Sequence, residues 1–508
     1  MKDVNRRLNQ RTTFLRALWD KGARKRPRWV CPGTEESTAS TPYRRIRQAR
    51  QKSKSRQRRG VALIMVLGAL VVLTVFATEL QERTSSTLSA AHAERDSLKA
   101  EYSAKSAVNL SRLLIATEPV VRAAIEPLYK MALKSSAPQI PVWKFTSLVL
   151  GPFNDANGAQ DFERVTQSPT ATGKSLGLTG GRFELKIVDE DAKINVNGAV
   201  SGEALARQRL GSQLLGLFGG ARYNQLFEDV DLDGQHSNQP VICGAMVDWS
   251  DYDEVAFPCD PLGQPSGSES GEDNYYPGVG LNYTRKNAPF DSLEELRLIR
   301  GVGDDFWSNF VDPEPEDPEQ RVLTVWGQGD KINVNTANPQ TLLAIVCASA
   351  PDALVCNDVE QIMNFLTALT LARELTQGAP LFKSPKAFVR AMRGKGKGIG
   401  PLFEAFGVEP VEFKNPKQVE KSISIESRVF SIYAYGIVPG RQRETRIRIH
   451  DVVDFRSANE LVPEPDATGS GTSAPEPDPP ATGEVTPEQL AAALASDPMG
   501  VIIYHRIE

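Results

Sequence analysis

The longest apolar stretch of the chain runs from Val61 to Thr78, eighteen residues without a charged side chain. At about 1.5 Å of rise per residue, a helix of this length crosses most of a hydrocarbon core of roughly 30 Å. Residues 79–116 then contain neither glycine nor proline and are rich in residues that favour helix. The pattern predicts one helix over residues 61–118, embedded in a membrane at its start and amphipathic at its end.

Alternating apolar and polar positions predict β-strands further along the chain. Residues 182–188 follow a Gly-Gly pair, and residues 427–436 and 444–453 flank a turn that predicts a β-hairpin. The apolar run 501–504 is expected to form a last strand. At 290–303 an N-cap precedes a pattern of helical period that breaks at Gly-Val-Gly, which resembles a helix-hairpin-helix.

The sequence Lys-Ile-Asn-Val-Asn occurs twice, at 193–197 and at 331–335. Each copy is expected to end a strand, and each is followed by a helical stretch. Two copies of so specific a sequence indicate a duplicated helical unit. Residues 456–487 are rich in Pro, Glu, Asp, Gly, Ser and Thr, and this composition predicts a flexible linker.

Charge distinguishes the two sides of the apolar stretch. The first 60 residues carry 19 Lys and Arg against 4 Asp and Glu, whereas the rest carries 40 against 59, a balance of −19. Positive residues keep a flank cytoplasmic, so the pattern predicts a basic inner segment and a large exported part. An uncleaved signal anchor is one interpretation. A basic leader that ends in Gly60 before an apolar helix starting at Val61 also resembles the class III signal of type IV pilins and type II secretion pseudopilins.

Five cysteines occur, and Cys31 lies in the basic leader. The other four fall as two close pairs, Cys243 with Cys259 and Cys347 with Cys356. Close pairs in an exported, oxidising compartment predict disulfides, with local pairing as the natural connectivity. A cysteine metal site has no support, because there is no Cys-x-x-Cys or nearby histidine pair.

Two acidic clusters are the best candidates for chemistry. Asp229, Asp231 and Asp233 alternate before a glycine, as in the first half of a calcium loop. The position of the bidentate glutamate of an EF-hand is Pro240, so the full loop is absent, and a solvated acidic turn is the alternative. The second cluster combines residues 248–254 with 271–276. Its hard oxygen ligands without histidine favour Ca²⁺ over a transition metal.

Several ordered motifs resemble the minor pseudopilin K family of type II secretion systems. They are Asp248-Trp-x-Asp-x-Asp, Gly271-Glu-Asp-x-x-Tyr, Asn287-Ala-Pro-Phe-Asp-Ser-Leu-Glu-Glu-Leu and Ile332-Asn-Val-Asn-Thr-Ala. The resemblance runs from Arg59 to about Phe455 and implies an α+β fold. In that fold a long N-terminal helix packs on an antiparallel pilin-like sheet, which is interrupted by a large helical insertion with sterile-alpha-motif-like (SAM-like) parts.

The resemblance also implies a division of the chain. The expected parts are a cleaved basic leader (1–60), the long helix (61–118), a pilin-like α/β part (119–192), a first helical domain with the acidic calcium loop (193–330), a second helical domain (331–412), the β-hairpin of the pilin-like sheet (413–455), the linker (456–487) and a terminal helix and strand (488–508). The protein is expected to cross the bacterial inner membrane once, with its C-terminal domain in the periplasm.

Site residues follow from the same resemblance. The family binds calcium in the acidic loop, which corresponds here to Asp251, Asp253, Glu272 and Asp273; Asp229, Asp231, Asp233 and Asp248 are further candidate ligands. Prepilin peptidase is expected to cut between Gly60 and Val61 and to methylate Val61. Ordinary pilins carry Glu at the fifth mature position, whereas Met65 stands there in this chain and suits a subunit at the tip of the fibre.

The expected function is that of a non-enzymatic minor pseudopilin at the tip of the type II secretion pseudopilus. It would take part in pseudopilus assembly and in export of folded proteins across the outer membrane, with the minor pseudopilins I and J and the major pseudopilin as partners. Nucleic acid and small-molecule substrates are not expected.

Two other classes of protein compete with this interpretation. The helix-hairpin-helix pattern also fits a membrane-anchored periplasmic DNA-binding protein of the competence type. The −19 balance and Asp304-Asp305, directly after Gly303, oppose binding to phosphate. An enzyme is not indicated, since the four histidines are scattered and the sequence contains no nucleophile elbow or phosphate loop.

Overall fold

The structure is a computed structural model that falls into two units, Met1–Glu82 and Arg83–Glu508, which are described separately. The described residues are 58–508 except 155, 167–179, 229, 231–233, 235, 260–274, 328, 330, 377, 396–397, 441–442 and 459–497. Residues 1–57 of the expected leader, most of the linker and the expected helix after residue 487 therefore lie outside the described residues.

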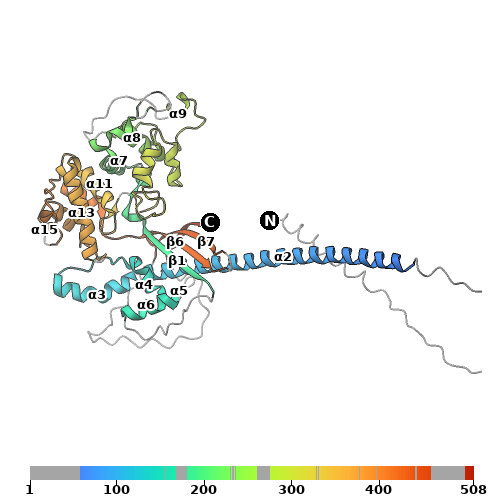
Figure 1. The fold of residues 1–508 in the computed structure, drawn as a ribbon. Helices are drawn as coiled ribbons and strands as arrows, with labels where there is room; N and C mark the ends of the chain where they lie inside the picture. Colours follow the sequence, from blue (N-terminus) through green and yellow to red (C-terminus); the bar gives the residue numbers. More distant parts are fainter. Residues whose placement is uncertain are drawn as a thin grey trace, which may run out of the picture. The chain divides into compact units, whose positions relative to one another are not determined.

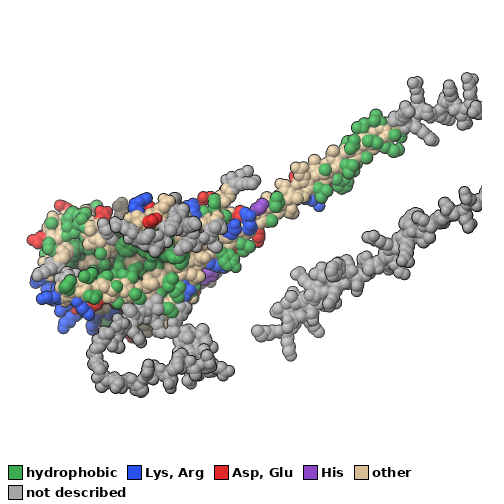
Figure 2. Space-filling model, turned by 90° about the horizontal axis from the view of Figure 1, so that it is seen from below, with side chains coloured by type: hydrophobic (Ala, Val, Ile, Leu, Met, Phe, Trp, Pro, Cys, Tyr) green, Lys and Arg blue, Asp and Glu red, His purple; other side chains and the backbone are tan. Residues whose placement is uncertain are grey.

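Helix α2 spans Arg58–Ala116 and covers nearly all of the predicted range (Figure 1). Its large apolar side chains from Val61 to Phe76 are exposed, as Figure 2 shows along the narrow helical part of the molecule. Among the described residues it is the one helix long and apolar enough to cross a membrane, judged by length and composition. The expected stop at Pro119 coincides with a break, after which α3 (Glu118–Leu133) begins with proline in its first turn.

A four-stranded antiparallel sheet lies in the second unit. Its order is β1-β6-β7-β8, formed by β1 (Arg182–Asp189), β6 (Val429–Val438), β7 (Thr445–Asp454) and β8 (Val501–Ile507). Strands β6 and β7 are the predicted hairpin, and β1 pairs with β6 from Arg182 opposite Ile437 to Asp189 opposite Phe430. With its long helix, this sheet and many shorter helices, the chain has the predicted α+β fold.

The C-terminal half of α2 packs directly on the centre of this sheet. The backbones approach so closely at Gly436 that an added Cβ atom would lie 1.7 Å from the carbonyl oxygen of Ala100. Glycine is therefore required in β6 at this point. The core between helix and sheet includes Ala104, Val108, Phe183, Ile432, Ala434 and Ile449. Short helices continue this layer: η1 (Val142–Phe145), α4 (Thr146–Val149), α5 (Gly151–Asn154) and α6 (Ala156–Thr166).

The helical insertion lies between β1 and β6 and was expected as two domains. Its two halves instead share one hydrophobic core, because α7 packs on α11. A Cβ atom at Gly216 would lie 2.1 Å from the carbonyl oxygen of Ala344. The elements are η2 (Glu190–Ala192), β2 (Ile194–Asn195), η3 (Val196–Ala199), α7 (Ala204–Phe218), η4 (Ala221–Phe227), α8 (Gln239–Ser250), α9 (Tyr275–Gly278), η6 (Leu293–Leu298), α10 (Asp304–Phe306), η7 (Trp307–Val311), β3 (Leu323–Thr324), β4 (Ile332–Asn333), α11 (Pro339–Ser349), α12 (Leu354–Asn357), α13 (Val359–Leu375), α14 (Pro385–Met392), α15 (Gly400–Ala405), α16 (Pro416–Ser422) and β5 (Ile423–Ser424).

The two Lys-Ile-Asn-Val-Asn copies make the same local structure. Each contains a two-residue parallel strand, β2 paired with β3 and β4 paired with β5. In the first copy Asn197 accepts a hydrogen bond from Phe290 N (2.7 Å) and donates one to Phe290 O (3.0 Å). In the second copy Asn335 makes the same pair of bonds with Phe382, at 2.8 and 2.9 Å. We call each pair an Asn–Phe clamp.

One sequence-based expectation is wrong in detail. The α-helix predicted after Ser292 is a 3₁₀-helix, η6, and the Ser292 side chain makes no capping bond. The reason is tertiary. The Glu295 carboxylate accepts hydrogen bonds from Asp291 N (2.9 Å), Lys286 Nζ and the Trp249 indole, and these contacts fix the turn in another geometry.

Candidate functional site

The C-terminal end of α8 carries the acidic residues of the second predicted cluster. The helix begins where the Asn238 side chain accepts a hydrogen bond from Val241 N (3.1 Å) and ends at Ser250. Asp248 therefore lies in the last turn and Asp251 is the C-cap residue, and both are buried. Asp253 follows in a bend and is partly exposed.

Two arginines from other parts of the chain contact these aspartates. Arg207, on α7, contacts Asp251 Oδ2 at 3.2 Å and also bonds Asp253 Oδ2. The buried Arg285 lies 3.6 Å from Asp251 Oδ1 and donates hydrogen bonds to the carbonyl oxygens of Asp248 (3.1 Å) and Asp253. These five residues form what we call the Asp–Arg cluster.

Three carboxyl groups and two guanidinium groups meet in the Asp–Arg cluster. Burial raises the pKa of Asp248 to about 8, and repulsion from Asp251 adds to this effect. Burial also raises the pKa of Asp251 above its usual range. Asp251 is 1% exposed, and among the described residues its Oδ1 atom has no hydrogen-bond partner. This oxygen has an ion-pair contact with Arg285 at 3.6 Å but no hydrogen bond, and a cation bound closer to it would stabilise it further.

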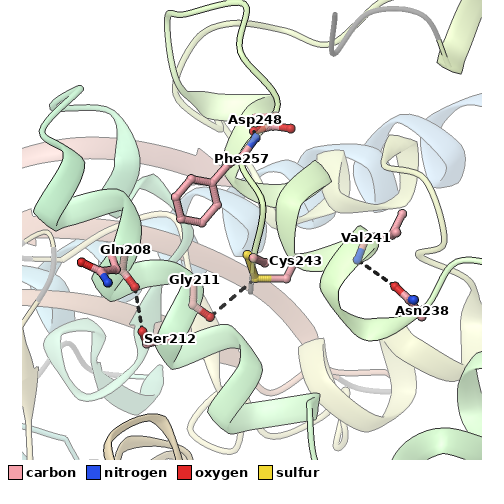
Figure 3. Close-up of a disulfide and its surroundings, with 9 residues drawn as sticks. Gln208, Gly211, Ser212, Asn238, Val241, Cys243, Asp248 and Phe257 are labelled. Carbon is pink, nitrogen blue, oxygen red and sulfur yellow. Dashed lines mark hydrogen bonds between the residues drawn. A yellow bond between two sulfur atoms is a disulfide. The ribbon is translucent and has the colours of Figure 1, made fainter. Parts of the chain in front are cut away.

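A disulfide fixes the segment that follows the cluster. Cys243, on α8, is bonded to Cys259, and Phe257 N donates a hydrogen bond to Asp248 Oδ1 (2.8 Å). Figure 3 shows Gly211 of α7 next to Cys243, and Phe257 next to Asp248. An added Cβ atom at Gly211 would lie 2.8 Å from the Phe257 ring, so glycine is required for this close approach. The second disulfide joins Cys347 at the end of α11 to Cys356 in α12.

Comparison with known proteins bears on this region directly. Residues 192–309, which contain the Asp–Arg cluster and the first Asn–Phe clamp, match the family model described as type II secretion system (T2SS), protein K. Over these residues the chain is similar to protein K of type II secretion systems. This confirms the resemblance drawn from the sequence motifs.

A search of solved structures adds a more distant likeness. The GspK-GspI-GspJ complex from the type 2 secretion system of enterotoxigenic Escherichia coli contains a chain of 16% sequence identity and TM-score 0.33. The alignment covers 65% of this chain and 81% of that one. A search of curated proteins gave no match.

The structure brings together part of the predicted calcium loop of this protein K relative. Asp248, Asp251 and Asp253 lie in the Asp–Arg cluster, whereas Glu272, Asp273, Asp229, Asp231 and Asp233 lie outside the described residues. Among the residues that are described, no group of three or more His, Cys, Asp or Glu side chains is arranged to hold a metal ion. The Asp251 oxygen that accepts no hydrogen bond, and the nearby carboxyl groups of Asp248 and Asp253, fit a hard cation that takes further oxygens from elsewhere.

Sequence reasoning missed Arg207 and Arg285. Neither stands in a motif, and each reaches the aspartates from more than 30 positions away, 44 in the case of Arg207 and Asp251. The one signal for Arg285 is its burial, since an arginine that is only 6% exposed is rare unless it has a charged partner.

The expected processing site lies at the start of α2. Gly60 and Val61 fall in its first turn, which begins at Arg58. Met65 is 69% exposed on the same helix. An uncharged side chain at this position costs nothing to place in lipid, unlike a carboxylate. Among the described residues, the one helix of membrane-spanning length and apolar composition fits a single-pass membrane anchor.

Proposed function

We propose that this protein K relative is a non-enzymatic minor pseudopilin at the tip of the type II secretion pseudopilus. In this role it takes part in pseudopilus assembly and in export of folded proteins across the outer membrane. The match of residues 192–309 to the protein K family carries the proposal. An apolar helix that continues into the core of an α+β unit supports it, because such a helix can leave the membrane and pack against other subunits.

The proposal includes maturation by prepilin peptidase at the cytoplasmic face of the inner membrane. The test is N-terminal sequencing of the full chain purified from membranes of cells that contain the peptidase. The expected N-terminus is methylated Val61. A Gly60→Val variant is expected to stay uncut, whereas Gly68→Val, in the same helix with nothing within 4 Å of its added Cβ, is expected to be processed. An intact residue 1, or a start far from Val61, contradicts the proposal.

The proposed partners are the minor pseudopilins I and J and the major pseudopilin of the same organism. Co-purification of the full chain with each of them, singly and in combination, tests this. Retention of I and J together is expected. A chain that is processed at Val61 but retains neither contradicts the tip assignment and leaves the processing result standing.

We further propose that the Asp–Arg cluster takes part in binding Ca²⁺. Asp251 and Asp253, with Glu272 and Asp273, are the proposed ligands, and Asp248, Asp229, Asp231 and Asp233 are further candidates. A divalent cation would favour the ionised form of Asp248, whose pKa burial raises to about 8, and its binding free energy would stabilise the folded loop.

Thermal unfolding with and without EDTA tests the calcium proposal. Chelation is expected to lower the unfolding temperature, and added Ca²⁺ is expected to restore it. Asp251→Asn should abolish the EDTA effect, whereas Asp305→Asn, an exposed aspartate on α10, should keep it. No shift with EDTA in the wild-type chain would contradict calcium binding.

A further inference from the structure

Helix α14 and the residues that flank it carry a stripe of positive charge on their exposed side. Lys386 and Arg390 lie one turn apart on the same face of the helix, Lys383 directly precedes the N-cap residue, and Arg393 is the C-cap residue. All four are exposed, while Phe388, Val389, Ala391 and Met392 bury the opposite face. We call these four residues the cationic stripe.

The cationic stripe has no partner in the part of the chain that the structure describes. None of its four side chains forms a hydrogen bond or an ion pair there. The sequence around it offers none either, since no Asp or Glu occurs between residues 376 and 403. Four like charges within eleven residues repel one another, so an anion that lies against the stripe would stabilise it.

The fold itself does not require these charges. The two Asn–Phe clamps make Phe290 and Phe382 equivalent positions of the duplicated unit. One residue after each phenylalanine stands Asp291 in the first copy and Lys383 in the second; four residues after it stand Glu294 and Lys386. The same structural positions are therefore acidic in one copy and basic in the other. A basic stripe here reflects what the second copy binds rather than how it folds.

The chain contains a segment of opposite charge. Residues 459–497 hold eight Asp and Glu and neither Lys nor Arg. The second unit, to which the stripe belongs, anchors both ends of this segment. Ala458 packs on the core of the sheet, and Arg112 donates hydrogen bonds to the carbonyl oxygens of Met499 (2.9 Å) and Gly500 (2.7 Å).

The acidic segment is long enough to reach the stripe. Its middle is about 20 residues from either end, which allows a reach of about 65 Å in an extended chain. A compact unit of the size of Arg83–Glu508 has a radius of gyration of about 22 Å. Tethering at both ends also keeps the segment at an effective concentration in the millimolar range, so that weak charge pairing suffices.

We propose that the acidic segment 459–497 docks on the cationic stripe of α14 within the same chain. The stripe is an electrostatic surface for an acidic, extended peptide, and the chain supplies that peptide itself. Docking neutralises the cationic stripe and shields it from other polyanions in the periplasm.

Zero-length carbodiimide cross-linking of the full chain in detergent, followed by mass spectrometry, tests the docking. Cross-links are expected between Lys383 and carboxylates of residues 459–497. Their yield should fall at least fivefold between 0.05 M and 1 M salt, because screening shortens from about 14 Å to about 3 Å. The double variant Lys386→Glu/Arg390→Glu should lose the cross-links at Lys383, although Lys383 itself is retained.

Two variants control for general effects of charge reversal. Arg95→Glu/Lys99→Glu reverses an exposed pair of the same types and spacing on α2, and it should leave the cross-links unchanged. Adding Glu476→Lys/Asp478→Lys to the reversed stripe should restore them. Cross-links that persist in the reversed stripe, or that are absent from the wild-type chain, overturn the proposal. So do cross-links that join isotopically labelled to unlabelled copies in a mixture, because these assign the segment to a second copy.

A binding assay tests whether the cationic stripe instead takes nucleic acid or an anionic membrane. Duplex DNA and phosphatidylglycerol vesicles are each titrated against the wild-type chain and a variant whose eight acidic residues in 459–497 are amides. Docking predicts that the neutralised variant binds at least tenfold more tightly, and that Lys386→Glu/Arg390→Glu removes this gain. Equal, stripe-dependent binding by the wild-type chain and the neutralised variant shows that the stripe is open to the polyanion and overturns the proposal.

Discussion

The second Asn–Phe clamp gives a sharp test of the duplicated architecture. Substitution of Asn335 by alanine removes two hydrogen bonds, one from Phe382 N (2.8 Å) and one to Phe382 O (2.9 Å). Phe382 is only 2% exposed, so water cannot replace the lost partner without opening the core. The clamp joins β4 to the residues that precede α14, and its loss should loosen the second copy of the repeat.

The size of the effect follows from these two bonds. A hydrogen bond contributes about 1 kcal/mol net, and each buried polar group left unpaired costs about 1–3 kcal/mol. We therefore expect Asn335→Ala to lower the free energy of unfolding by about 3 kcal/mol. In a protein of this size that corresponds to a fall of about 3 °C in the unfolding temperature. Asn197→Ala should have at least as large an effect, since Asn197 also donates to Val325 O (2.9 Å).

Chemical denaturation of the full chain in detergent, followed by tryptophan fluorescence, measures the change. The midpoint should shift at constant slope, because the amount of surface exposed on unfolding stays the same. Asn357→Ala is the matched control. Asn357 also makes two hydrogen bonds, to the carbonyl oxygens of Pro351 (2.7 Å) and Ala353 (3.1 Å), but it is exposed. Its loss should cost under about 0.5 kcal/mol. Equal losses in the two variants would refute the assignment of Asn335 as a clamp.

Three further predictions concern other parts of the second unit. Gly436→Ala should destabilise the fold by about 3 kcal/mol, because the added Cβ would lie 1.7 Å from Ala100 O. The control Gly278→Ala, whose Cβ would have nothing within 4 Å, should be close to neutral. Similar unfolding midpoints for the two variants would contradict the close packing of α2 on β6. Burial lowers the pKa of His450 from 6.5 to about 4, despite nearby Glu190. The folded protein should therefore lose up to about 3 kcal/mol of stability as the pH falls from 6.5 towards 4, because the histidine of the unfolded chain takes up a proton first. In a pH series of unfolding midpoints, His450→Asn should flatten this dependence, and an unchanged dependence would contradict the prediction. Paired serine substitution of Cys347 and Cys356 should lower the free energy of unfolding by about 3 kcal/mol, because the unfolded chain regains the conformational freedom of a nine-residue loop. An unfolding midpoint that does not change when the wild-type chain is reduced would show that the bond does not form in the protein.

The sequence made several local features predictable. The uncharged run from Val61 fixes a membrane-length helix, since no other conformation satisfies the backbone in lipid. The hairpin of β6 and β7 follows from alternation and a short turn, both within 30 residues. The repeated Lys-Ile-Asn-Val-Asn marks the duplication, and Asp251 and Asp253 are close in space because they are close in sequence.

Tertiary structure decided the features that join distant residues. Strand β1 pairs with β6 across the whole helical insertion, and the terminal strand β8 joins the sheet edge beside β7. No periodic pattern encodes such a pairing, because the strands carry the same alternation whichever partner they take. The shared core of the two helical halves also joins distant residues. Nothing in the sequence shows that Gly216 must be glycine, and only its close approach to Ala344 in the folded chain explains the requirement.

The candidate site shows the same division. Its carboxylates are a motif in one short stretch, and the motif is sufficient to suggest a cation. The charge balance, however, depends on Arg207 and Arg285, which the fold brings in from α7 and from the segment after α9. Electrostatic energy depends on the distance between charges in space, and for residues far apart in the chain the sequence does not give this distance. The sequence by itself determined which groups were available, and the packing of distant segments decided which of them meet.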